Sequence, residues 1–186
     1  SLADAVNGVA HQEIADIPEC DFYLIACKPQ QISDLGKRLK GLIANDKTII
    51  SILAGTTVQT LIKNLEQDRI IRVMPNIPCL ISEGISLVYL TDNIEKSENS
   101  FIINQLEFVS KVIVVQKESK IDEYIGISAS GPAYIFELAR ILSTKASQLG
   151  LPEEEAISMV NQMIYGSAKL LKDSNESAEL LRNKVT

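Results

Sequence analysis

The sequence predicts an α/β fold in which a parallel sheet is followed by an all-α region. In the first part of the chain, short apolar runs alternate with helical stretches, as in βαβ units. After Ser119 no strong strand pattern follows, and apolar residues recur at helical spacing. The 186 residues suffice for two small domains. We therefore assign residues 1–119 to the sheet domain and residues 120–186 to the helical domain.

Five short runs rich in apolar and β-branched residues predict the strands of the sheet. Continuous apolar runs are typical of parallel strands that are buried on both faces. Proline ends the first run, at Lys28-Pro29, because it cannot donate to the ladder. The predicted strands are Phe22–Cys27, Thr48–Leu53, Ile70–Met74, Ile85–Leu90 and Val112–Val115.

Helical spacing of apolar residues predicts the segments between and after these strands. Thr57 is a candidate N-cap, and Gly150 is a suitable C-cap. Proline and three carboxylates open one of the long helices, as the positive end of a helix favours. The predicted helices are Ile32–Ala44, Val58–Leu65, about 98–110, Pro132–Gln148, Leu151–Lys172 and a short helix from Ser177 toward Lys184.

Composition excludes several classes of function. Eighteen basic and 24 acidic residues give a net charge of −6, which argues against nucleic-acid binding and against attraction to anionic membranes. A single histidine, His11, rules out a multi-histidine metal site, and we expect no metal. The cysteines Cys20, Cys27 and Cys79 form no CxxC pair, so reduced thiols in a cytoplasmic protein are expected. The apolar runs are too short to span a membrane, and the first residues carry no signal-peptide pattern.

The helical region is small for an independent core. Three helices in about 65 residues give a marginal core. We expect their apolar surface to be buried against another copy of the chain, in a homodimer or higher homo-oligomer. The alternative is a compact three-helix domain packed on its own sheet.

Three loops follow the carboxyl ends of predicted strands, where open α/β sheets bind ligands. They are residues 26–30, 51–55 and 73–78. Lys28 could meet a phosphate or ribose, and Asn76 offers a donor and an acceptor from a loop stiffened by prolines. Taken singly, each of these loops can also be explained as an ordinary turn, and each polar side chain as a solvated one.

A fourth segment, Ser128–Tyr134, places two hydroxyls and a glycine before a helix. Free N–H groups and the positive end of the helix dipole lie at such a place. Plain helix capping is the alternative reading of this segment.

In combination and in this order, these segments resemble pyrroline-5-carboxylate reductase, the last enzyme of proline synthesis. The family patterns LAVKPQ, SxxAG, RxMPNTP, SGSGPAY, GLP and LRDKVT have counterparts here. They are Ile25–Gln30, Ser51–Gly55, Arg72–Pro78, Ser128–Tyr134, Gly150–Pro152 and Leu181–Thr186. The resemblance extends over about residues 8–186.

The resemblance implies an incomplete Rossmann-type sheet domain and a helical dimerisation domain that interlocks with a partner chain. It implies that NADPH, or NADH, gives a hydride to the imine carbon of 1-pyrroline-5-carboxylate and yields L-proline. A protonated imine is already electrophilic, so positioning and exclusion of water can supply most of the acceleration. We therefore identify no acid–base catalytic residue.

The resemblance also assigns candidate site residues. Those near the adenosine and phosphates of the cofactor are Ala26, Cys27, Lys28 and Pro29. Those near the nicotinamide and its ribose are Ile52, Leu53, Ala54, Gly55 and Asn76, and Lys184 would reach the cofactor of a joined site. The candidate substrate residues are Ser130, Val185 and Thr186.

The chain also departs from the family pattern at positions that bear on cofactor binding and activity. None of the nine glycines is two residues from another, so the chain holds no GxGxxG turn for a pyrophosphate, and no SPGGTT follows Thr186. Glu13 falls where the family has an asparagine on the adenine ribose, and Ile77 replaces a threonine. We expect the 186-residue polypeptide alone not to turn over. The alternatives are a non-catalytic oligomerisation or regulatory paralogue, and a related NADP-dependent reductase of another imine or ketone.

Overall fold

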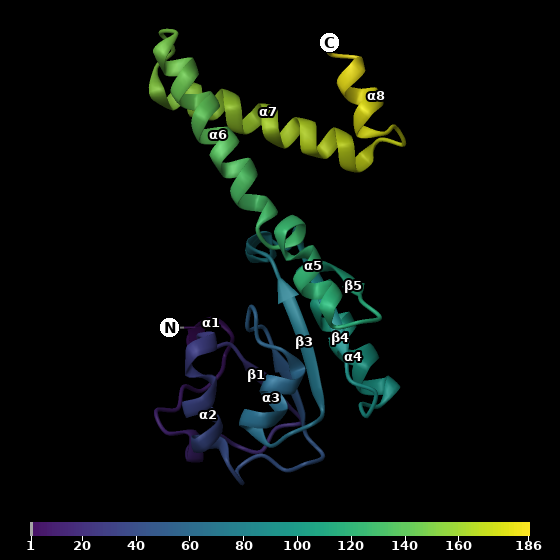
Figure 1. The fold of residues 1–186 in the computed structure, drawn as a ribbon. Coiled ribbons are helices and arrows are strands. Elements are labelled where there is room, and N and C mark those ends of the chain that lie inside the picture. The colour runs from purple at the N-terminus through teal and green to yellow at the C-terminus, as the bar shows by residue number, and fades with distance from the viewer. Residues whose placement is uncertain (1) are drawn as a thin grey trace. The chain divides into compact units, whose positions relative to one another are not determined.

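A computed structural model describes residues 2–186 (Figure 1). The chain divides into two compact units, one ending at Ser130 and one comprising Gly131–Thr186. This division lies eleven residues beyond the boundary expected from the sequence, because helix α5 (Ser119–Ser128) packs on strands β3 and β4 of the sheet unit.

The sheet unit contains five strands whose order in the sheet is their order along the chain. They are β1 (Phe22–Ile25), β2 (Thr48–Ser51), β3 (Ile70–Pro75), β4 (Gly84–Leu90) and β5 (Ser110–Val114). Neighbours are parallel except β3 and β4, which are antiparallel. The α/β class is confirmed, with one departure from a purely parallel sheet. Only residues 76–83 join β3 to β4, and a parallel crossover needs about a dozen residues or more.

Helices connect the strands much as the sequence predicts. They are α1 (Leu2–Ala5), α2 (Ile32–Leu39), α3 (Val58–Leu65) and α4 (Lys96–Glu107), with short 3-10 turns η1 (Ile14–Asp16), η2 (Pro29–Gln31) and η3 (Ile77–Ile81). Thr57 caps α3, since its hydroxyl accepts from the amide of Thr60 at 3.2 Å. Helix α2 is shorter than predicted and ends at Leu39. The chain turns at Gly41, whose φ is +72°, a value that favours glycine.

Alternation along the strands sends apolar side chains to both faces of the sheet. Ile70 packs with Ile49 and Leu61 in a cluster under α2 and α3. The next residue, Ile71, joins a second cluster that includes Ile102 of α4. Helices α2 and α3 lie side by side (Figure 1), and they approach so closely that a Cβ on Gly36 would lie 2.0 Å from the carbonyl oxygen of Asn64.

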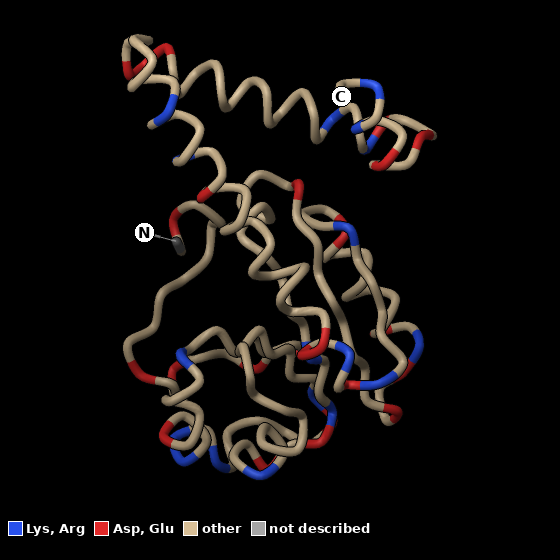
Figure 2. The backbone as a smooth tube through the Cα atoms, turned by 45° about the horizontal axis from the view of Figure 1, so that its top comes forward, with Lys and Arg blue, Asp and Glu red and all other residues tan. Residues whose placement is uncertain are grey.

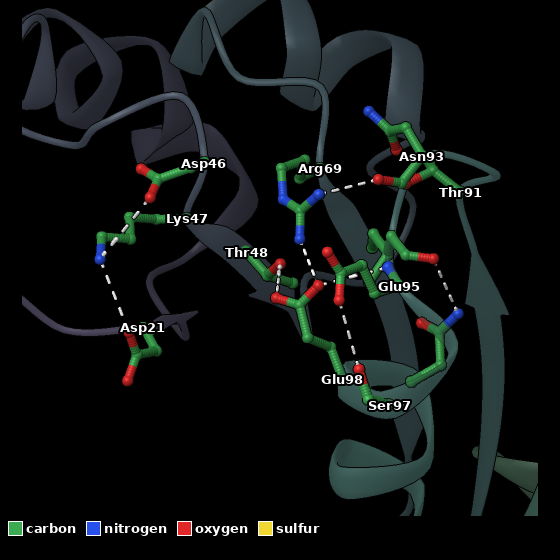
Figure 3. A network of polar contacts seen from close by, with 12 residues as sticks. Asp21, Asp46, Lys47, Thr48, Arg69, Thr91, Asn93, Glu95, Ser97 and Glu98 are labelled. Carbon is green, nitrogen blue, oxygen red and sulfur yellow. Dashed lines mark hydrogen bonds and ion pairs between the residues drawn. The ribbon is translucent and has the colours of Figure 1, made fainter.

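A polar network fixes the amino ends of β2 and β3 to α4 (Figure 3). Glu98 of α4 accepts from the Thr48 hydroxyl at 3.2 Å and forms an ion pair with Arg69. Arg69 Nη1 also donates to the carbonyl of Asn93 at 2.8 Å. Burial acts to raise the pKa of Glu98, but the hydrogen bond from Arg69 and the remaining donors outweigh it and lower that pKa.

The helical unit consists of α6 (Gly131–Gln148), α7 (Glu153–Asp173) and α8 (Ala178–Asn183). The turn between α6 and α7 passes through Gly150, at a φ of +101°, and the Ser177 hydroxyl caps α8 by accepting from Leu180 N. In this unit, which the structure describes throughout, only Ala156 and Val160 are buried. Many large apolar side chains are exposed, among them Tyr134, Ile135, Phe136, Leu138, Ile141, Met159, Met163 and Tyr165. By itself the unit therefore encloses almost no core.

Charge is unevenly distributed along the helical unit. No charged residue lies between Glu155 and Lys169, so α7 appears in Figure 2 as a long tan stretch bounded by coloured ends. Within residues 2–186, none of the helices combines the length and the apolar character that a membrane span requires.

Candidate functional site

The carboxyl ends of β1 and β2 lie side by side at one edge of the sheet. Ile25 is in register with Ser51, and Ser51 with Arg72 of β3. The Ile52 amide donates to the Ile25 carbonyl at 3.2 Å. The structure therefore brings together the two loops that the sequence predicts to bind the cofactor.

The loop after β1 leads directly into the turn η2. The Lys28 amide donates to Gln31 Oε1 at 2.9 Å. Ala26 and Lys28 are exposed, whereas Cys27 and Pro29 are half-buried. A cavity of about 200 Å³ adjoins Cys27, and its lining includes Arg38 of α2.

Arg38 is a residue that the sequence analysis missed. Its spacing from Gln31 and Asp34 along the helix places all three on one face of α2, and this spacing was the available signal. It adds a second cation near the loop that carries Lys28.

The loop after β2 exposes its backbone at one point. Ile52 is half-buried and Leu53 is 2% exposed, with its side chain in the core. Ala54 and Gly55 are exposed, and Gly55 has a φ of +65°. No atom lies within 4 Å of where a Cβ on Gly55 would stand, so a flat ligand can approach this backbone. The loop therefore fits the role of a cofactor-binding turn.

The side chain of Asn76 joins three segments of the chain. Its Nδ2 donates to the carbonyl of Ser128 at 3.0 Å, and its Oδ1 accepts from the amide of Ile85 at 2.9 Å. Asn76 thereby ties the end of β3 to β4 and to the end of α5. The donor and acceptor that the sequence suggested for a ligand are already engaged within the protein, and a cofactor contact by Asn76 stays a prediction.

Cys79 and Gly84 pack against each other beside Asn76. A Cβ on Gly84 would lie 2.2 Å from Cys79 Sγ, so the start of β4 requires glycine. Cys79 belongs to the three free cysteines of the described chain, together with Cys20 and Cys27.

The segment Ser128–Tyr134 spans the junction of α5 and α6. The Ser128 hydroxyl donates back to the carbonyl of Tyr124 at 3.1 Å, so it does not cap α6. The Ser130 amide donates to the carbonyl of Ile125 at 2.9 Å, and the Ser130 side chain is exposed. Ser130 remains available to a ligand.

A buried ion-pair cluster, which the sequence analysis missed, lies on β3. Arg72 is 1% exposed and donates to Glu118 Oε1 at 2.8 Å and to Asp122 Oδ1 at 2.7 Å. Burial acts to lower the pKa of Arg72, but the hydrogen bonds with Asp122 and Glu118 outweigh it and raise that pKa. Arg72 therefore stays charged inside the sheet unit.

The carboxyl-terminal candidates lie in the helical unit. Lys184 Nζ binds both carboxylate oxygens of Glu176, at 2.6 and 2.7 Å. Val185 is 88% exposed, and the Thr186 hydroxyl donates to the carbonyl of Arg182 at 3.2 Å. The structure thus places the predicted loops in one unit and these three residues in the other.

Among residues 2–186, no group of three or more histidine, cysteine, aspartate or glutamate side chains is arranged to hold a metal ion. The features that remain suited to a ligand are the open backbone at Ala54–Gly55, the cations Lys28 and Arg38 at the loop after β1, and the exposed hydroxyl of Ser130.

Comparison with known proteins points to one family. Residues 118–186 match the family model described as pyrroline-5-carboxylate reductase dimerisation. The chain is 30% identical over 170 residues to a pyrroline-5-carboxylate reductase of Arabidopsis thaliana, an alignment that covers 91% of the chain and 61% of the relative. The chain thus spans about three fifths of the length of this relative.

Two solved structures share the fold at somewhat lower identity. One is a pyrroline-5-carboxylate reductase of Coxiella burnetii, with a TM-score of 0.80, 28% identity and coverage of 99% of this chain and 69% of that one. The other is the Plasmodium falciparum pyrroline carboxylate reductase with NADP bound, with a TM-score of 0.78, 26% identity and coverage of 90% and 63%.

Proposed function

We propose, from the similarity of nearly the whole chain to pyrroline-5-carboxylate reductases, that the protein containing it reduces 1-pyrroline-5-carboxylate to L-proline with NADPH or NADH. The observation that carries the proposal is the match of nearly the whole chain, in sequence and in fold, to reductases of this name. The Plasmodium relative with NADP bound supports a nicotinamide cofactor. The reaction is the last step of proline synthesis, and we assign the protein to the cytoplasm.

The proposed mechanism relies on positioning. The bound dinucleotide supplies the hydride. In the proposal, Ala26–Pro29 hold its adenosine and phosphate side, Ile52–Gly55 follow the nicotinamide ribose, and Asn76 fixes the loop beside the ring. A protonated cyclic imine accepts a hydride without a further acid, so the protein has to align the reacting atoms and exclude water.

The residues proposed for the substrate are Ser130, at the end of the sheet unit, and Val185 and Thr186 of the helical unit. Ser130 offers an exposed hydroxyl, and Val185 and Thr186 border the substrate. Lys184 reaches the cofactor of the joined site in this proposal, which requires it to leave its ion pair with Glu176.

The proposed partner is a second copy of the chain. The exposed apolar side chains of α6 and α7 and the uncharged stretch of α7 form a surface suited to burial in a dimer. Between these helices lies a groove of about 650 Å³, whose lining includes Ala139, Ser143, Ile157 and Asn161. The family model matched by residues 118–186 supports homo-oligomerisation through this unit.

A steady-state assay tests the activity. We expect the full-length protein to oxidise NADPH in the presence of 1-pyrroline-5-carboxylate and the 186-residue polypeptide to show no turnover, since it holds no GxGxxG turn. Turnover by the 186-residue polypeptide would contradict the second expectation.

A non-catalytic oligomerisation or regulatory paralogue is the second candidate, because the family model that residues 118–186 match is described by dimerisation. Isothermal titration of the full-length protein with NADPH separates the two. Micromolar binding together with turnover supports the reductase, and a stable dimer that binds no dinucleotide supports the paralogue.

A further inference from the structure

The loop that joins β2 to α3 is anchored at both of its ends. At its start, the Ile52 amide donates to Ile25 O, and the Leu53 amide donates to Ser51 Oγ at 3.3 Å. At its end, the Val58 amide donates to Glu118 Oε1 at 2.7 Å. Between these anchors lie the exposed Ala54 and Gly55.

Glu118 is remote in sequence from the loop that it anchors. It precedes α5, and sixty residues separate it from Val58. The carboxylate accepts from the first amide of α3, at the positive end of the helix, where a negative charge is favourable. The Thr57 hydroxyl accepts from the amide of Thr60. Thr57 and Glu118 therefore accept from different amides at the amino end of α3.

The same oxygen of Glu118 accepts from Arg72 at 2.8 Å. Arg72 is in register with Ser51, the residue at which the loop begins. One buried guanidinium therefore lies beside the start of the loop through the sheet and is linked to its end through Glu118. Charge-assisted hydrogen bonds of this kind are about twice as strong as neutral ones.

Asp122 provides an internal comparison. It accepts from Arg72 at 2.7 and 3.2 Å, whereas Glu118 accepts from Arg72 at 2.8 Å, and both residues lie at the amino end of α5. The bonds recorded for its carboxylate go to Arg72, whereas Glu118 bonds to Arg72 and Val58.

We propose that Glu118 is a positioning residue that sets the Ala54–Gly55 backbone for the sugar-phosphate part of a dinucleotide. This rests on the proposed function, because it takes that loop as a cofactor-binding turn. Loss of the Glu118 carboxylate frees the start of α3 and loosens the loop. Loss of the Asp122 carboxylate weakens the hold on Arg72 but leaves the loop anchored.

The test compares Glu118→Ala with Asp122→Ala in the full-length protein, by hydrogen exchange at residues 53–58 and by the dissociation constant for NADPH. We expect Glu118→Ala, which removes the acceptor for the Val58 amide, to speed exchange of that amide and its neighbours at least tenfold and to weaken NADPH binding by about the same factor. Asp122→Ala should change both less than threefold. In the assay, the Glu118 variant should raise the KM for NADPH more than it lowers kcat.

Two results overturn the proposal. One is equal effects of the two substitutions on loop exchange, which would make Glu118 a mere counter-ion of Arg72. The other is faster loop exchange with unchanged NADPH affinity, which would separate the loop from the cofactor. Wild-type protein that binds no NADPH would refute the proposed function and with it the cofactor role of Glu118, while loop exchange would still decide whether Glu118 anchors the loop. Glu118→Asp, which keeps the charge on a shorter side chain, serves if the alanine variant does not fold.

Discussion

The sheet unit and the helical unit differ in how much of their apolar surface is buried. The sheet unit encloses apolar clusters on both faces of its strands, with residues such as Ile49, Leu61 and Ile71 fully buried. The helical unit buries Ala156 and Val160 and leaves its aromatic and aliphatic side chains exposed. The sheet unit therefore has its own core, whereas the helical unit encloses almost none, and we propose that it completes one against a second copy of the chain.

The strongest test of this difference removes a core side chain from the sheet unit. Leu61→Ala should lower the free energy of unfolding by about 2–5 kcal/mol, because a fully buried leucine leaves a cavity. Urea unfolding of the sheet unit measures this. The matched substitution in the helical unit, Leu138→Ala, should cost the unassociated chain less than about 1 kcal/mol, because Leu138 is already 45% exposed. Similar losses at both positions would contradict the comparison.

A second test concerns the close packing of α2 and α3. Gly36→Ala should destabilise the sheet unit by about 1–3 kcal/mol, since its Cβ would meet the carbonyl of Asn64 at 2.0 Å. Gly126→Ala in α5 is the control, because the added methyl group would meet no atom within 4 Å apart from the neighbouring residues and the backbone of its own helix. Thermal unfolding should show a clear loss for Gly36→Ala and none for Gly126→Ala, and a tolerated Gly36→Ala would show that the two helices can separate.

A third test addresses the exposed face of the helical unit. Phe136 is 58% exposed, and Phe136→Ala should weaken the dimer about tenfold or more, equivalent to about 1.4 kcal/mol, with little effect on the unfolding of the sheet unit. Analytical ultracentrifugation over a concentration series measures the dimer dissociation constant. Asn175→Ala, in the turn between α7 and α8, should leave that constant unchanged. An unchanged constant in the Phe136 variant would remove this residue from the interface.

The smallest expected effect is the pH dependence contributed by Glu98. Its pKa in the folded protein lies below the ordinary value of 4.5, so its stabilising contribution is present above that pH and is lost as the pH falls through the lowered pKa. Glu98→Gln should remove this part of the acid-side slope, an effect of up to about 1 kcal/mol. Urea unfolding between neutral and acidic pH measures it, with the exposed Glu107→Gln as control. Parallel pH profiles for wild type and Glu98→Gln would contradict the expectation.

Local features of the fold could be predicted from the sequence, because their causes lie within a few residues. The helix Val58–Leu65 with its Thr57 cap and the capping of α8 by Ser177 are confirmed. The antiparallel placement of β4 was missed, although the short connection of residues 76–83 contained the signal. The early end of α2 reflects a turn at Gly41 that apolar spacing alone does not reveal.

The candidate site was less accessible to sequence reasoning. The proximity of the loops after β1 and β2 follows from a parallel sheet and could be predicted. The Arg72–Glu118 pair spans 46 residues and depends on where α5 packs, so no local pattern points to it. Asn76 was singled out for its polar side chain, but periodicity could not show that both ends of its amide are engaged within the protein.

The sequential order of the strands in the sheet has a kinetic consequence. Each of the five strands is hydrogen-bonded only to strands that are adjacent to it along the chain, so no strand has to wait for a pairing partner that is synthesised much later. A nascent chain could therefore extend the sheet one strand at a time as it leaves the ribosome. The pairing of Arg72 with Glu118 and Asp122 would come last, after α5 has been synthesised, and pulse-labelled exchange during refolding would reveal that order.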